Sequence, residues 1–141
     1  MLLQGSCHCG RLSVTFATDH TVEELPLRAC QCTFCRRHGG LTTSDPEGEI
    51  VLRVRGQLPR WYRFGTGATD FWVCPECGVY VGASVEVEGR RYAVVNVRAL
   101  DDAKRFTQPP TPMVYDTETP GERLGRRARV WSPARIDHAG G

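Results

Sequence analysis

The chain has 141 residues, a formal net charge of +2 at pH 7, and 24% charged residues. A chain of this length forms one domain with its own core, so we expect a single domain over residues 1–141. The small net charge gives no reason to expect nucleic acid as a partner, and no run approaches the roughly 18 apolar residues of a membrane span. The N-terminus lacks the basic and apolar regions of an export signal. We therefore expect a cytoplasmic protein with no membrane partner, and the sequence indicates no oligomeric state.

The first half of the chain predicts short strands separated by polar loops. Residues 11–16 alternate, with Leu12, Val14 and Phe16 on one face, which is typical of a half-buried strand. Residues 18–26 predict a loop with a helical turn at 21–25, and residues 41–48 predict a second loop. Residues 49–55 alternate again and predict another strand.

The second half continues the same pattern. Residues 60–64 and 69–73 predict strands on either side of a glycine-rich turn, and residues 79–87 and 90–97 predict a hairpin about Glu88-Gly89. A short helix is expected at 102–106, a loop at 108–112, and short strands at 114–115 and 128–131. Residues 137–141 are expected to fray. Many short strands and few helical stretches predict a mainly β fold.

Seven cysteines form the most specific signal in the sequence: Cys7-X-Cys9, Cys30-X-Cys32-X-X-Cys35 and Cys74-X-X-Cys77. Their odd number and close spacing favour metal-bound thiolates over disulfides. The two outer pairs make one complete tetrahedral set, whereas the central group is one ligand short of it. A second partition would join Cys32 and Cys35 to Cys74 and Cys77 as a zinc ribbon. We disfavour it because ribbon pairs are only about 15–20 residues apart.

The division into four and three thiols predicts two different zinc sites. Four thiolates close a site that holds chain segments together, whereas three leave one position for an outside ligand. A soft thiol suits that position and would be deprotonated there, ready to attack an aldehyde carbon. The candidate structural ligands are therefore Cys7, Cys9, Cys74 and Cys77, and the candidate catalytic ligands are Cys30, Cys32 and Cys35. Because three ligands hold a metal less securely than four, the central site can be empty in purified protein.

Side chains near the central motif have alternative interpretations. Arg36 and Arg37 either bind a substrate carboxylate or belong to a solvated loop. His38 could close the central zinc as a fourth ligand, although an exposed or outer position is favoured beside Gly39-Gly40. Phe34 and Trp72 are candidates for the wall of a pocket. A basic stretch near the C-terminus predicts a solvated strand face or, alternatively, a rim that collects anions; it comprises Arg123, Arg126, Arg127 and Arg129.

Four motifs occur in an order that resembles a known family: Gly5-Ser6-Cys7-X-Cys9-Gly10, Cys30-X-Cys32-X-X-Cys35-Arg36, Cys74-X-X-Cys77-Gly78 and Leu100-Asp101-Asp102. Residues 5–102 thereby resemble the glutathione-dependent formaldehyde-activating enzyme family, which includes the centromere protein V group. Residues 103–141 are expected to form a C-terminal extension packed on this part. The chain carries Gln31 and Val79 where the family often has histidine and a small polar residue, respectively.

The resemblance implies a β-tent of small antiparallel sheets held by zinc. It implies a structural zinc on the outer pairs and a catalytic zinc on the central group, so two Zn²⁺ per chain. It further implies a carbon–sulfur lyase that joins formaldehyde to glutathione as S-hydroxymethylglutathione, with a small thiol such as glutathione as partner. The alternative function is a non-catalytic zinc module that binds a protein or carries metal.

Overall fold

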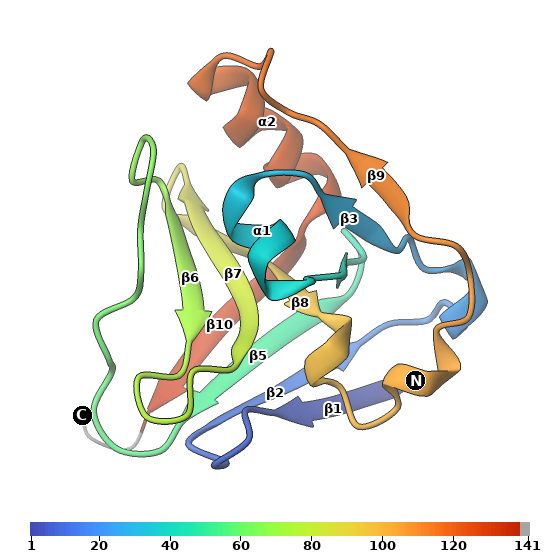
Figure 1. The fold of residues 1–141 in the computed structure, drawn as a ribbon, viewed down its shortest axis with the longest axis vertical. Helices are drawn as coiled ribbons and strands as arrows, with labels where there is room; N and C mark the ends of the chain where they lie inside the picture. The colour runs from blue at the N-terminus through green and yellow to red at the C-terminus, as the bar shows by residue number, and fades with distance from the viewer. Residues whose placement is uncertain (139–141) are drawn as a thin grey trace.

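Ten strands form one sheet in the structure, a computed structural model that describes residues 1–138 (Figure 1). Neighbouring strands follow the order β1 (Leu2–Ser6), β2 (Leu12–Ala17), β5 (Glu49–Val54), β10 (Ser132–His138), β8 (Arg90–Asn96), β4 (Thr42–Thr43), β3 (Arg28–Cys30) and β9 (Thr111–Met113), and β7 (Tyr80–Val87) and β6 (Thr69–Val73) extend the sheet from β8. The mainly β prediction is confirmed. The sheet is mixed, because β10 runs parallel to β5 and β9 runs parallel to β3. The more specific β-tent architecture stays a prediction.

Two α-helices and three short 3₁₀ turns complete the described residues. Helix α1 (Thr33–His38) packs beside β3, and helix α2 (Pro120–Val130) packs against β7 (Figure 1). The 3₁₀ turns are Val22–Glu24, Val97–Ala99 and Ala103–Arg105. The first and third confirm the helical turns expected at 21–25 and 102–106. Within residues 1–138, no helix is long and apolar enough to cross a membrane.

Strands were predicted correctly where apolar and polar residues alternate and residues typical of turns follow. Leu12, Val14 and Phe16 are buried on one face of β2, and the intervening residues are half-buried. The β7–β8 hairpin turns at Glu88 and Gly89, whose φ values of 53° and 78° are those of a tight turn with two left-handed residues. Strand β2 contributes its buried residues to the larger hydrophobic core, and the hairpin contributes to both the larger and the smaller one.

Two predicted short strands are wrong. Residues 60–64 form only an isolated bridge between Tyr62 and Phe71. The Tyr62 and Phe64 rings stack on Phe34 and Phe71, respectively. The strand expected at 114–115 instead lies at Thr111–Met113 and begins within the loop expected at 108–112. It includes Pro112, which an edge strand tolerates because one side of its backbone needs no partner.

The strand predicted at 128–131 is also wrong, since most of this stretch belongs to helix α2. Thr119 caps the helix by accepting the Glu122 N–H at 3.1 Å, while Glu122 accepts the Thr119 N–H in return. Strand β10 follows and pairs with β5 as far as His138, so residues 137 and 138 do not fray. The remainder of that predicted frayed end, 139–141, lies outside the described residues.

Four further strands were not predicted, and β3 and β10 are two of them. Residues 2–6 form β1, and the loop expected at 41–48 contains the two-residue strand β4. Strand β1 forms a hairpin with the next strand, β2, whereas β4 pairs with β8, far along the chain. Trp72, a candidate pocket wall, lies fully buried in the core and donates its Nε1–H to Ser84 at 3.1 Å. The expectation that Trp72 lines a pocket is therefore wrong.

Close backbone packing at Gly5 positions the first cysteine pair. Gly5 pairs with Val14 of β2 and forms a bridge to Leu100. A Cβ atom on Gly5 would lie 2.2 Å from the Ala99 carbonyl oxygen and 2.8 Å from the Leu100 Cα. Any side chain here must therefore push β1 away from the turn that precedes Asp101.

We expect Gly5→Ala to lower the free energy of unfolding by about 1–3 kcal/mol, the usual cost of overpacking. Chemical denaturation of metal-loaded protein measures the change. Gly121→Ala is the matched control, because a Cβ atom there meets nothing within 4 Å and alanine favours the helix. Equal stability of the two variants would contradict the close approach at Gly5.

Candidate metal centres and adjoining cavity

The outer cysteines meet where two turns face each other. Cys7 and Cys9 follow β1, and Cys74 and Cys77 lie between β6 and β7. Their four sulfur atoms all lie within 4.8 Å of one another, with Cys9 Sγ 3.7 Å from Cys7 Sγ and 3.6 Å from Cys74 Sγ. Four thiolates at zinc bond lengths of about 2.3 Å have sulfurs about 3.8 Å apart. This group therefore has the donors and spacing of a closed zinc site.

Backbone hydrogen bonds shape both turns in the same way. Cys7 N–H donates to the Leu12 carbonyl at 2.9 Å, and Cys74 N–H donates to the Val79 carbonyl at 3.0 Å. Gly10 and Gly78 close the turns with φ values of 83° and 80°, which an L side chain would strain. Each turn thus presents two thiols toward the other, and a shared ion would join β1 to the β6–β7 pair.

The central cysteines come from one continuous segment. Cys30 ends β3, Cys32 caps α1 and accepts the Cys35 N–H at 3.4 Å, and Cys35 lies inside the helix. Their three sulfur atoms also lie within 4.8 Å of one another. Within the described residues, the structure thus brings the seven thiols together as four and three, and Cys32 and Cys35 do not join Cys74 and Cys77.

Proton sharing distinguishes the three central thiols. Hydrogen bonds from Cys30 and Cys35 lower the pKa of the Cys32 thiol. The pKa of Cys30 is raised, mainly by its hydrogen bond to Cys32. The pKa of Cys35 is raised, mainly by its hydrogen bond to Cys30. Three adjacent thiolates repel one another, so all three ionise together only when a cation neutralises them. The donor set therefore suits a soft, thiolate-binding metal ion.

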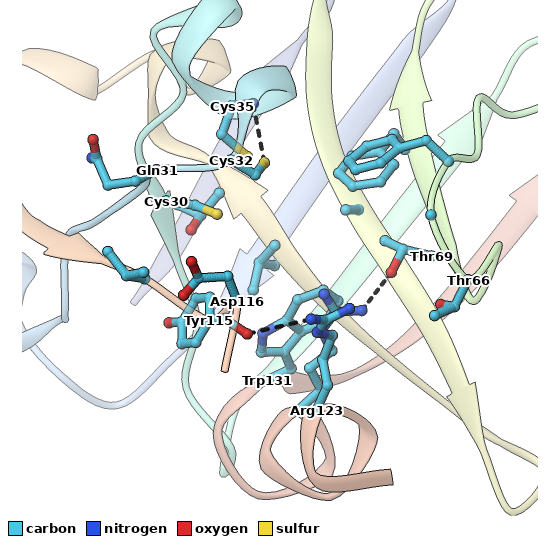
Figure 2. A pocket seen from close by; sticks show the side chains of 18 of the residues that line it. Cys30, Gln31, Cys32, Cys35, Thr66, Thr69, Tyr115, Asp116, Arg123 and Trp131 are labelled. Atoms are coloured by element: carbon cyan, nitrogen blue, oxygen red, sulfur yellow. Dashed lines mark hydrogen bonds between the residues drawn. The ribbon is translucent and has the colours of Figure 1, made fainter. Parts of the chain in front are cut away.

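A cavity of about 320 Å³ opens beside these three cysteines (Figure 2). Its apolar wall comes largely from the smaller of two hydrophobic clusters and includes Phe71, Val94 and Trp131. Tyr80 also lines it, and burial, followed by the nearby thiols, raises the pKa of its phenol. By contrast, the outer cysteines are absent from this cavity's lining among residues 1–138. A second hollow touches the outer group at Cys74 alone, so among the described residues only the central group has three thiols that all line one cavity.

Comparison with known proteins decides the family. Residues 2–117 match the family described as glutathione-dependent formaldehyde-activating enzyme. The chain belongs to this family. The family name indicates an enzyme of glutathione and formaldehyde chemistry, and the match confirms the resemblance carried by the cysteine motifs.

A crystal structure of a Rhodobacter sphaeroides protein has a similar fold. The two share 24% sequence identity with a TM-score of 0.53, over 78% of this chain and 99% of that one. At this identity the likeness supports the fold alone. No sequence among curated proteins matches the chain.

The side chains beside the central cysteine motif of this glutathione-dependent formaldehyde-activating enzyme family member do not line the cavity. Arg36 and Arg37 are exposed on α1 and do not line the cavity, so their substrate-binding role stays a prediction. The His38 ring packs 4.6 Å from the Phe34 ring and is not part of the thiol group among the described residues. The Phe34 ring packs against the Phe71 ring, with 4.4 Å between ring centroids, and Phe34 does not line the cavity.

Sequence reasoning missed several residues that do line the cavity: Gln31, Thr69, Tyr80, Tyr115, Asp116 and Trp131. It named Arg123 and Arg127 only as part of a basic stretch, and both also line the cavity from α2. The capping box from Thr119 to Glu122 was the signal that could have revealed this helix. Gln31 is notable because it stands at a position where the family often has histidine.

Proposed function

We propose that the protein is a zinc-dependent, carbon–sulfur lyase-type enzyme that joins a thiol such as glutathione to formaldehyde, or cleaves the adduct. The observation that carries this proposal is the contrast between the two thiol groups. The four outer thiols make up a full set of four zinc ligands, whereas the three central thiols are one ligand short and line a cavity. Family membership supports the choice of thiol and aldehyde. We propose further that the chain is a single cytoplasmic domain.

The cysteines fit zinc in number, type and spacing. We propose Cys7, Cys9, Cys74 and Cys77 as ligands of a structural Zn²⁺, and Cys30, Cys32 and Cys35 as ligands of a catalytic Zn²⁺. When bound at the central group, zinc would offer a coordination position to the substrate thiol and lower its pKa. The Cys35 N–H bond to Cys32 Sγ helps to hold this ligand in place.

The proposed reaction is an addition without redox change. A carbon–sulfur bond forms between the thiol sulfur and the aldehyde carbon, while the carbonyl π bond breaks. The thiol proton ends on the former carbonyl oxygen, giving a hydroxymethyl thioether; the reverse step returns thiol and formaldehyde. The apolar wall of Phe71, Val94 and Trp131 limits water around the reacting atoms, and the fixed cavity orients them.

Cobalt substitution tests this proposal directly, because cobalt–sulfur bands report on thiolate ligands at each site. We expect glutathione to alter the bands of the central ion and leave those of the outer ion unchanged. Consumption of formaldehyde in the presence of glutathione, followed by NMR, then measures turnover. Bands that no thiol alters would contradict the enzyme proposal and favour the non-catalytic zinc module.

A further inference from the structure

Helix α2 places positive charge in the cavity at a distance from the cysteines. Arg123 and Arg127 both line the cavity, together with Trp131, which follows the helix. In Figure 2, Arg123 and Trp131 lie at one end of the cavity and the three cysteines lie at the other. A ligand with its sulfur at the cysteines would therefore extend toward these arginines.

Among the described residues, Arg127 has fewer polar partners than Arg123. Its guanidinium donates to Thr69 Oγ1 and lies over the Trp131 ring, with 4.8 Å from Cζ to the ring centroid. Its Nε is buried and has no hydrogen-bond partner within residues 1–138. In the same part of the chain, no carboxylate oxygen lies within 4.0 Å of it. Arg127 is half-buried, and a partly desolvated cation without an anionic partner is unfavourable, so this arrangement indicates an anion from outside the chain.

The neighbouring charges do not supply that anion. Glu118 is occupied by Arg126, at 2.9 and 3.1 Å, and lies 3.9 Å from Arg123 Nε. Arg123 also donates to the Tyr115 carbonyl at 3.3 Å. Asp116 lines the cavity but is exposed, and it forms no ion pair among the described residues. Burial and the proximity of Arg126 and Arg123 lower the pKa of Arg127 to about 10, which still leaves it charged at neutral pH.

The position of α2 in the chain bears on specificity. The family match ends at residue 117, and α2 begins at Pro120. The cysteine motifs therefore lie within the matched part, whereas the arginines that line the same cavity lie beyond it. At about 320 Å³, the cavity is near the small end of the range for ligand pockets, roughly 300–1,000 Å³.

We propose that α2 provides an anion subsite in which Arg127, assisted by Arg123, holds the carboxylate of a small acidic thiol whose sulfur lies at the central cysteines. This inference rests on the proposed function and adds a substrate class and a specificity-determining residue to it. Arginine suits the task because its planar donors match the two oxygens of a carboxylate.

A matched pair of thiols tests the subsite. The probes are 3-mercaptopropionate and 2-mercaptoethanol, which differ mainly in the carboxylate, and their affinities are read from the cobalt–sulfur bands of the fully loaded protein. We expect the wild type to favour 3-mercaptopropionate by about 10- to 100-fold, the usual effect of hydrogen bonds to a buried charge. Arg127→Gln should bring this ratio close to one, and Arg123→Gln should lower it in part.

Arg129→Gln is the control, because it removes one charge from an exposed position of the same helix. Its ratio should equal that of the wild type. If Arg127→Gln does not fold, as judged by circular dichroism, the wild type and Arg123→Gln still give the ratio. Competition by propionate, but not by propanol, then checks the carboxylate contact in wild-type protein.

The possible failures are distinguishable. Equal affinity of the wild type for both thiols would overturn the anion subsite and leave the proposed function standing. Equal weakening of both thiols in Arg127→Gln would show that Arg127 only balances the charge of the cysteines, which also overturns it. Bands that neither thiol alters would refute the proposed function and this inference together.

Discussion

Cys74→Ser is expected to unfold most of the protein at 25 °C or to lower its stability by about 3 kcal/mol or more. Cys74 is 1% exposed and its sulfur lies 3.6 Å from Cys9 Sγ, at the junction between the N-terminal strands and the β6–β7 pair. Structural zinc contributes roughly 10–16 kcal/mol of binding free energy in small zinc domains, and whole proteins are stable by only about 5–15 kcal/mol. A serine oxygen cannot replace a soft thiolate at this metal.

Thermal melts combined with zinc counts measure this effect. The variant should lose the zinc of the outer group and melt well below the wild type, even in excess zinc. A variant that keeps the wild-type melting temperature after losing one zinc would contradict the structural role of the outer group.

Cys32→Ser is expected to abolish activity and leave the fold intact. The zinc content should fall from two to one per chain, and turnover should fall by about 100-fold or more, beyond the usual effect of disturbing residues around a metal site. The fold should survive because serine is a good helix cap, and its hydroxyl can accept the Cys35 N–H that the Cys32 sulfur accepts now. The ligand is lost while the start of α1 is preserved.

The same melts and metal counts, together with an assay of formaldehyde consumption, check this result. Cys32→Ser should melt within a few degrees of the wild type, in contrast to Cys74→Ser. Equal loss of fold in the two variants would contradict the division into a structural and a catalytic group. Full turnover by Cys32→Ser would remove the central cysteines from the proposed chemistry.

Much of the site could be predicted because its information is local. Within each cysteine motif, successive cysteines are two or three residues apart, and such spacing brings their sulfurs together locally. The β7–β8 hairpin was predicted for the same reason, since Glu88-Gly89 sets the turn between two alternating runs. The pairing of Cys7 and Cys9 with Cys74 and Cys77 followed from counting ligands, and the structure has the four sulfurs together.

The rest depends on contacts between residues far apart in the sequence. Strand β10 lies parallel to β5, and no local pattern in residues 132–138 indicates that partner. The cavity wall opposite the cysteines depends on the position of α2, which is set by the pairing of the flanking strands β9 and β10. Arg36 and Arg37 attracted attention because they follow Cys35 in the sequence, yet Arg123 and Arg127 are the arginines that line the cavity.

The location of α2 between β9 and β10 has an evolutionary consequence. Both flanking strands are anchored in the sheet, β9 on β3 and β10 on β5 and β8, so the segment between them can be shortened, lengthened or replaced without moving a cysteine. Relatives could thus diversify in the molecules they accept while inheriting the same sulfur framework. Grafting this segment from one relative into another would be a practical route to altered selectivity.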